Sequence, residues 1–434
     1  MAKKIIVLII SSLLIFALAA CGSGGKEANG DNKGNGSDGS QVELRMAWWG
    51  GQERNDMINE LLDAFEEAHP NIIVAREFGN ETQFVEKVIT QSAGGNTPDV
   101  FQASSFYLDD FIERKMYKEL DELVASGDIN LDDFEEVDVE AGKKKGHQYL
   151  IAWGHIVTGV FYNADLFTKA GVTFPENNWS WEEYEKTALE IQEHLGDDAW
   201  ATEDEGGAYR GLELFALQRG KSLFTEDGLG IDKQDLIDWY TLWDNLRKAG
   251  AIPPAAIQTE QGGKSQEQSL LAQGKVSMIS TSSNQLKTYQ GSTENELNIV
   301  SYPWIENAQK DVPLIISGIG MSAHTKHPKE AATLINWLVN DPGAAAIFKG
   351  EHGQPPSKKM QEVIKDELSE SQHKEYEYID EMLPMLTSYP VLPTGSTSVQ
   401  KLIMAENEAI AFGQKSIEKA VDDFFTQAEQ ILKR

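Results

Sequence analysis

Aromatic and hydrogen-bonding side chains follow the first segment that has the pattern of a strand. Residues 42–49 begin with polar and apolar residues in alternation and end in Trp48 and Trp49, and Gln52 and Arg54 come soon afterwards. An indole ring can stack on the C–H face of a sugar ring, while amide and guanidinium groups can bind its hydroxyl or carboxylate groups. Successive side chains of a strand point to opposite faces. We therefore expect one tryptophan to face a ligand and the other to pack inward.

A second polar group follows the third predicted strand, residues 98–101. Its candidate ligand contacts are Gln102, Ser105 and Tyr107. In an open parallel sheet, ligands bind beyond the carboxyl ends of the strands, so this group occupies the same kind of position as the first.

Strands and helices alternate in the first part of the chain. The predicted strands cover residues 42–49, 72–75 and 98–101, and the predicted helices cover residues near 57–65, 82–92 and 106–117. This alternation predicts an α/β fold with a parallel sheet and right-handed crossovers.

A second α/β region follows. Its predicted strands are residues 149–153, 157–162, 276–280, 299–302 and 314–321, and its predicted helices include residues 181–195, 232–249, 328–341 and most of the chain after 358. Ser180 and Glu183 have the spacing of a capping box, which predicts a helix start. Gly318 and Gly320 suit either a hinge or close packing of their strand.

The composition restricts the classes of function. The chain has 434 residues, of which 41% are hydrophobic, and this suffices for two or three domains. Its formal net charge of −31 argues against nucleic acid and anionic lipid headgroups as partners. Cys21 is the single cysteine, which excludes internal disulfides and zinc–thiolate sites. We expect no metal and no cofactor, since the sequence carries no motif for either.

The N-terminus has the pattern of an export signal. Lys3 and Lys4 precede an apolar stretch, residues 5–20, which ends in Leu18-Ala-Ala-Cys21. This ending resembles the lipobox of bacterial lipoproteins, which implies that residues 1–20 are removed and that lipid on Cys21 anchors the protein to the cell membrane, outside the cytoplasm. An ordinary cleaved signal or a retained anchor helix is the alternative. Residues 22–41 lack large apolar side chains and are predicted to be a flexible tether. Together with the lipid-bearing Cys21 they form a predicted segment, residues 21–41, that precedes the folded part.

Several segments share their order and spacing with one family. They are Trp48–Gly50, Thr97–Val100, Phe161–Phe167, Asn178–Tyr184, Gly274–Met278 and Ile319–Asp341. Together they resemble the extracellular solute-binding proteins of family 1, the substrate-binding proteins of bacterial carbohydrate importers, which include maltose-binding protein.

The resemblance implies a periplasmic-binding-protein-like fold, in which two α/β lobes are joined by a multi-strand hinge with a ligand cleft between them. The first lobe would comprise residues 42–152 plus about 320–360, and the second residues 153–318 plus about 361–434. The chain would cross between lobes near Ala152–Trp153, near Ile316–Gly320 and after Ser357.

The resemblance also implies further ligand contacts. Trp153 and His155 would lie at the first crossing, although His155 could equally be a hydrogen-bonded structural histidine. Asn284 matches a position where relatives carry a ligand contact. Glu205 belongs to a polar segment, residues 200–210, that could either line the second lobe's face of the cleft or be an exposed loop.

The implied function is that of a lipid-anchored, monomeric binding protein, not an enzyme, which captures an oligosaccharide and delivers it to the permease of an ABC importer. Residues 48–54 together with 350–357 most resemble a subgroup that binds pectin-derived oligosaccharides, namely rhamnogalacturonan fragments, whereas neighbouring subgroups take neutral ones. Two alternatives remain at this point. One is a surface glycoside hydrolase with a pair of carboxylates about 5–9 Å apart. The other is a solute-binding protein for a ligand that is not a sugar.

Overall fold

The computed structural model describes residues 41–433 except 197, 226, 227, 263 and 391. The predicted signal peptide, Cys21 and the tether up to residue 40 lie outside these residues. Among the helices that the structure describes, none is both long enough and apolar enough to cross a membrane.

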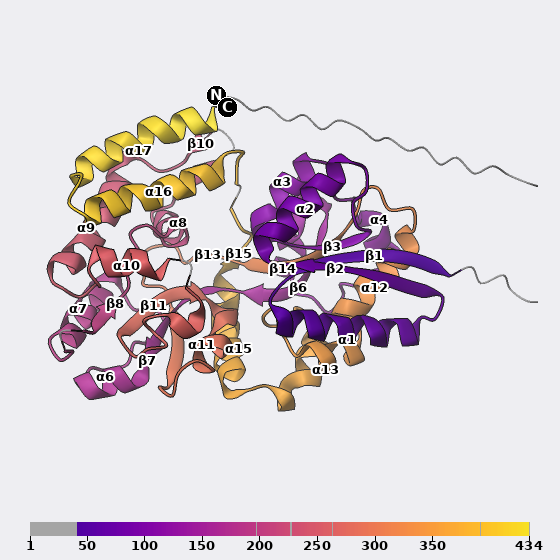
Figure 1. Cartoon of the computed structure of the whole chain (residues 1–434), viewed down its shortest axis with the longest axis horizontal. Coiled ribbons are helices and arrows are strands. Elements are labelled where there is room, and N and C mark those ends of the chain that lie inside the picture. The colour runs from indigo at the N-terminus through magenta and orange to yellow at the C-terminus, as the bar shows by residue number, and fades with distance from the viewer. Residues whose placement is uncertain (1–40, 197, 226–227, 263, 391, 434) are drawn as a thin grey trace, which may run out of the picture. The chain divides into compact units, whose positions relative to one another are not determined.

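The order of elements follows the predicted alternation (Figure 1). The strands are β1 (Val42–Trp49), β2 (Ile72–Gly79), β3 (Val100–Ser104), β4 (Lys143–Lys144), β5 (His147–Gln148), β6 (Leu150–Ile156), β7 (Thr158–Asn163), β8 (Trp200–Thr202), β9 (Phe224–Thr225), β10 (Gly228–Leu229), β11 (Val276–Ser282), β12 (Leu297–Ser301), β13 (Val312–Pro313), β14 (Ile315–Met321) and β15 (Leu386–Thr387). The α-helices are α1 (Gln52–Ala68), α2 (Glu81–Ala93), α3 (Ser105–Glu113), α4 (Asp121–Ala125), α5 (Glu136–Ala141), α6 (Ala164–Ala170), α7 (Trp181–Gln192), α8 (Tyr209–Leu217), α9 (Lys233–Lys248), α10 (Ala255–Gln261), α11 (Leu286–Gln290), α12 (Pro328–Asn340), α13 (Pro342–Phe348), α14 (Lys358–Ile364), α15 (Glu370–Met382), α16 (Ser396–Ala411) and α17 (Ile417–Leu432).

The first sheet has five strands in the order β2-β1-β3-β14-β6. β1 runs parallel to β2 and β3, as the alternation predicts, whereas β14 is antiparallel to both β3 and β6. Alternate side chains bury opposite faces of this sheet. Leu44, Met46 and Trp48 pack against α1, α12 and α13, while Ala47 and Phe101 pack against α2 and α3, and Figure 1 shows these helices on the two sides of the sheet. We call this sheet and its helices the first lobe.

The second sheet has four strands in the order β12-β7-β11-β8. β7 is antiparallel to β11 and β12, and β8 is parallel to β11. One face of this sheet packs against α6 to α9, α16 and α17, where Trp181, Trp239 and Trp243 contact one another edge to face. The capping box of Ser180 and Glu183 opens α7 as predicted. We call this sheet and its helices the second lobe.

The chain passes from the first sheet to the second at the single residue Val157, between β6 and β7. It returns to the first sheet between β12 and β14. A third crossing lies between α14 and α15, because α14 packs on α12 and α13 whereas α15 packs on β12. Residues 153–156 and 315–317 therefore pair within the first sheet, whereas the predicted boundaries placed them in the second lobe or at a crossing. β6 pairs with β14 up to Ile156, so both strands belong to the sheet that defines the first lobe.

The two glycines of β14 are positions of close packing. A Cβ atom on Gly318 would lie 2.5 Å from Leu150 Cγ, and one on Gly320 would collide with the ring of Tyr117. Neither glycine has a positive φ. Of the two interpretations of these glycines, the structure supports close packing.

Candidate ligand-binding site

The two tryptophans at the end of β1 have different surroundings. Trp48 is fully buried and stacks against Phe78, with ring centroids 6.3 Å apart. Trp49 is only partly buried and packs against Phe84 and Tyr107, at centroid distances of 5.1 and 6.2 Å. Trp49 is therefore the indole that a ligand can reach at the carboxyl end of β1, and Trp48 belongs to the core.

The polar residues expected after the third strand have distinct roles, and Gln102 lies within β3 because this strand extends to Ser104. Gln102 is fully buried; its Oε1 accepts from the backbone N–H of Trp49 at 3.2 Å and its Nε2 donates to Ser317 Oγ at 3.1 Å. Ser105 Oγ accepts from the Ile316 N–H at 3.0 Å. Gln102 thus joins β3 to β1 and β14, and Ser105 joins the start of α3 to β14. Tyr107 is partly exposed beside Trp49 and donates its hydroxyl to Glu81 at 2.8 Å; burial and Glu81 raise its pKa.

Trp153 and His155 are both buried in the first lobe. Trp153 stacks on Phe348, with ring centroids 4.6 Å apart. His155 Nε2 pairs with the equally buried Asp138 of α5. This burial favours the structural interpretation of His155, because neither side chain reaches the surface.

A charged cluster joins the two lobes. It consists of Arg54 at the start of α1, Glu351 after α13, and Lys287 of α11 in the second lobe. Arg54 Nη2 lies 3.3 Å from Glu351 Oε1, and Lys287 Nζ lies 3.9 Å from Glu351 Oε2. Arg54 Nε is buried and has no hydrogen-bond partner among the described residues. Gln52, by contrast, is exposed and donates to Asp56 Oδ1 at 2.7 Å.

The loop that carries Glu351 depends on its glycines. Gly350 and Gly353 have φ of +66° and +108°, values that other residues rarely adopt. The loop approaches β6 so closely that a Cβ on Gly353 would collide with the His155 carbonyl. In consequence His352 points inward, where burial lowers its pKa well below the usual range, while Glu351 remains partly exposed.

The second lobe presents a pocket of about 520 Å³ beyond the carboxyl end of β8. Its lining residues come from the loop after β8, from α10 and from α16: Glu203, Asp204, Glu205, Gly207, Ala208, Ala255, Gln258, Thr259, Gln261, Gly262, Met404, Asn407, Glu408 and Ala411. Glu205 is 9% exposed, and its Oε1 accepts from the Ser280 N–H at 3.2 Å. Burial raises the pKa of Glu205 to about 8 and that of Glu203 to about 7. Glu205 is therefore mainly protonated at pH 7, whereas about half of the Glu203 side chains are ionised.

A cation–aromatic contact also joins the lobes. The Arg210 guanidinium, at the start of α8, lies 4.5 Å from the ring centroid of Phe106 in α3, while its Nη1 donates to Ser282 Oγ at 2.8 Å. Phe106 meets Tyr389 edge to face at 5.0 Å. Asn284, two residues after β11, is partly exposed, and its Oδ1 is buried without a partner among the described residues.

The predicted site residues therefore divide into two groups. Trp49, Arg54, Tyr107, Glu205 and Asn284 lie at carboxyl ends of strands with partly exposed or pocket-lining side chains. The others, Trp48, Gln102, Ser105, Trp153 and His155, are buried in the first lobe, apart from the exposed Gln52.

The sequence did not predict the roles of four side chains in this region. Phe106, Lys287 and Glu351 were not among the predicted site residues, and Arg210 was not predicted to contact the other lobe. For Glu351 the sequence did contain a usable signal. Gly350 and Gly353 flank the pair Glu351-His352, and this pattern indicates a turn that presents polar side chains. Lys287 carries no local signal.

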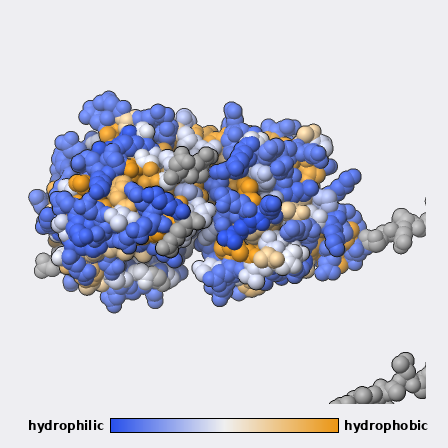
Figure 2. Space-filling model, turned by 90° about the horizontal axis from the view of Figure 1, so that it is seen from above, coloured by the Kyte–Doolittle hydropathy of each residue, from blue (hydrophilic) through white to orange (hydrophobic). Residues whose placement is uncertain are grey.

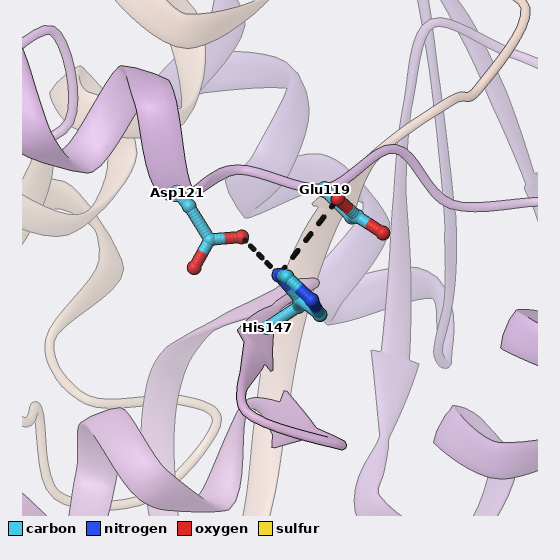
Figure 3. Close-up of side chains that lie close together, drawn as sticks. All are labelled: Glu119, Asp121 and His147. Carbon is cyan, nitrogen blue, oxygen red and sulfur yellow. Dashed lines mark hydrogen bonds and ion pairs between the residues drawn. The ribbon is translucent and has the colours of Figure 1, made fainter.

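Another group of ligand-capable side chains lies on the first lobe, away from the cluster (Figure 3). His147 Nδ1 is 3.2 Å from Asp121 Oδ2 and 3.8 Å from Glu119 Oε2. All three side chains are at least 43% exposed, and Tyr149 donates to Glu119 at 3.0 Å. The remaining surface is also mainly hydrophilic on the face shown in Figure 2, with hydrophobic areas scattered over both lobes.

Known proteins resemble this chain over most of its length. The galactooligosaccharide-binding protein of Bacillus subtilis is 24% identical over 365 residues, which cover 83% of this chain and 82% of that protein. The oligogalacturonide-binding protein of Yersinia enterocolitica, solved with saturated digalacturonic acid, matches with a TM-score of 0.77 and 21% identity, covering 91% of this chain and 99% of that one. An ABC substrate-binding protein of Listeria monocytogenes, solved with cycloalternan, matches with a TM-score of 0.77 and 20% identity, covering 90% and 98%.

The structural matches confirm the expected periplasmic-binding-protein-like fold. The family model described as bacterial extracellular solute-binding protein matches residues 51–345, which is more than half of the chain. This chain therefore belongs to the family of bacterial extracellular solute-binding proteins.

Proposed function

We propose that this protein is the substrate-binding protein of an ABC importer, that it captures an oligosaccharide between its two lobes, and that it delivers the sugar to the membrane permease. The observation that carries this proposal is Trp49. The residue is partly exposed at the carboxyl end of β1, and its indole meets the ring of Tyr107 edge to face. An aromatic face next to hydrogen-bonding groups suits the two kinds of surface that a sugar presents.

The second lobe supplies complementary polar groups. Asn284 follows β11 and Glu205 follows β8, and these strands are parallel neighbours, so both residues lie at one edge of the sheet. A ligand that contacts both lobes stabilises the conformation in which they are close together, because its affinity differs between the open and closed forms. The permease would then receive the closed form.

An oligosaccharide is the ligand class favoured by the relatives, whose names or bound molecules include galactooligosaccharide, digalacturonic acid and cycloalternan. Among these classes, a pectin-derived acidic oligosaccharide is supported here by Arg54, whose guanidinium can bind a uronate carboxylate with two hydrogen bonds.

Binding should be tested by titrating intrinsic tryptophan fluorescence with a panel of pectic and neutral oligosaccharides. We expect a saturable change in emission, because a sugar stacked on Trp49 alters the surroundings of that indole. Absence of a response to every sugar, confirmed by calorimetry, would contradict the proposal. Sustained release of new reducing ends during the same incubation would instead identify a glycoside hydrolase.

Lipid on Cys21 is the proposed anchor. The residues Leu18-Ala-Ala-Cys21 support it, and a tether would keep the binding protein at high local concentration near its permease. A Cys21→Ser protein should bind sugar in solution with unchanged affinity, while uptake of labelled oligosaccharide by cells decreases. Normal uptake by cells that express the variant at the wild-type level would mean that the anchor is dispensable.

A further inference from the structure

The charged cluster of Arg54, Lys287 and Glu351 contains two cations and one carboxylate. Each oxygen of Glu351 is directed to a different cation, at 3.3 Å from Arg54 Nη2 and 3.9 Å from Lys287 Nζ. The nearby Glu375 is buried, which raises its pKa to about 8, so it adds little negative charge at neutral pH. The cluster thus retains an excess of positive charge on a chain whose net charge is −31.

The Arg54 guanidinium is not fully used by Glu351. Only its Nη2 contacts that carboxylate, and its Nε is buried without a partner among the described residues. A guanidinium binds a carboxylate best through two parallel N–H···O bonds. A buried donor without an acceptor is also costly, so an incoming carboxylate that accepts from Nε would gain free energy there.

The carboxylate of a ligand can take the place of the Glu351 carboxylate without unfolding the surrounding residues. The side chains of Arg54, Glu351 and Lys287 are 19%, 21% and 44% exposed, so water and ligand can reach all three. The one contact between Arg54 and Glu351 is 3.3 Å long and not bidentate, so Glu351 holds the guanidinium less tightly than a bidentate carboxylate would. Glu351 lies on the loop between α13 and α14 and is partly exposed, so its side chain borders solvent.

We propose that Glu351 is a specificity-determining residue, an internal carboxylate that occupies the position of a uronate carboxylate and competes with it for Arg54 and Lys287. The inference rests on the proposed oligosaccharide function and names the ligand class as acidic sugars. A bound uronate pairs with both cations, one from each lobe, and Glu351 turns away. Because Glu351 is tethered, its local concentration is high, and only a ligand with additional contacts elsewhere in the site displaces it.

The test compares digalacturonic acid with its dimethyl ester, in which a neutral methyl ester replaces each carboxylate, by isothermal titration calorimetry. For Glu351→Gln we expect the affinity ratio of acid to ester to rise about two- to fivefold, the range that corresponds to one partly exposed ion pair. Glu367→Gln is the matched control. It removes the same charge from a surface pair with Lys349, at 2.7 Å, and should leave the ratio unchanged.

A second variant tests whether Glu351 competes with the ligand carboxylate for Arg54 or only changes the charge of the site. Arg54→Ala should lower the ratio of acid to ester towards one, because the ligand carboxylate loses its bidentate partner. The inference is overturned if Glu351→Gln leaves the ratio unchanged or lowers it, or if the wild-type protein binds acid and ester equally and neither variant alters this. Binding of neutral oligosaccharides in that case leaves the proposed function standing, whereas failure of all proteins to bind any sugar overturns both.

Discussion

The two lobes contribute to the candidate site in different ways. In the first lobe, the buried polar side chains are paired with neighbouring strands: Gln102 binds the backbone N–H of Trp49 and Ser317 Oγ, and Ser105 binds the backbone N–H of Ile316. In the second lobe, Glu203 and Glu205 border an open pocket, and burial raises the pKa of both. The difference teaches that the first lobe presents an aromatic side chain whose backbone is fixed by buried hydrogen bonds, and the second a pocket bordered by titratable side chains. We therefore expect the first lobe to select ligand shape and the second to respond to pH.

The largest expected effect is a loss of stability that distinguishes Trp48 from Trp49 in the first lobe. Trp48→Ala should lower the free energy of unfolding by about 3–5 kcal/mol, because it leaves a cavity in a fully buried position. Trp49→Ala should cost clearly less, since its side chain is partly exposed. Urea denaturation followed by circular dichroism measures both. Equal losses would mean that Trp49 also belongs to the core.

For ligand affinity we expect a marked effect of the Trp49 substitution, although that substitution has the smaller effect on stability. We expect Trp49→Ala to weaken oligosaccharide binding about 10- to 100-fold, as for an aromatic residue at the centre of a binding site. Trp200→Ala is the matched control, because Trp200 is also partly exposed but lies at the amino end of β8, away from the carboxyl edge. A comparable loss of affinity in the control would argue against a site at the carboxyl ends of the strands.

The smallest effect concerns pH and the second lobe. The pKa of Glu205 is raised from 4.5 to about 8 in the folded protein, so the unfolded chain loses this proton first as pH rises. Its stabilising contribution is therefore complete below about pH 4.5 and is lost as pH approaches 8. Glu205→Gln should reduce the fall in stability between pH 5 and 8 by at least about 1 kcal/mol.

The measurement for this prediction is urea denaturation at a series of pH values. Glu182→Gln, at an exposed position of α7, serves as the control and should leave the pH profile as in the wild type. If the two variants have the same profile, Glu205 does not carry the pH dependence.

Most elements were predictable because their signals are local. The alternation in residues 42–49 predicted β1 with the bounds that the structure has, and Ser180 with Glu183 predicted the start of α7. The direction of β14 was not predictable from the alternation. This strand reaches the first sheet from the second lobe, so it runs antiparallel to β3 and β6 although the sheet begins as a parallel one.

The sequence by itself determined the α/β class, the order of the elements and the family, because hydrophobic periodicity, caps and motif order are properties of short segments. Only the tertiary structure decided which side chains meet. Arg54 and Glu351 are 297 positions apart, and Lys287 comes from the other lobe. Their meeting depends on how the sheets pair and on a glycine loop that turns His352 inward and leaves Glu351 outside. No local pattern encodes such a contact, since it results from the packing of distant segments.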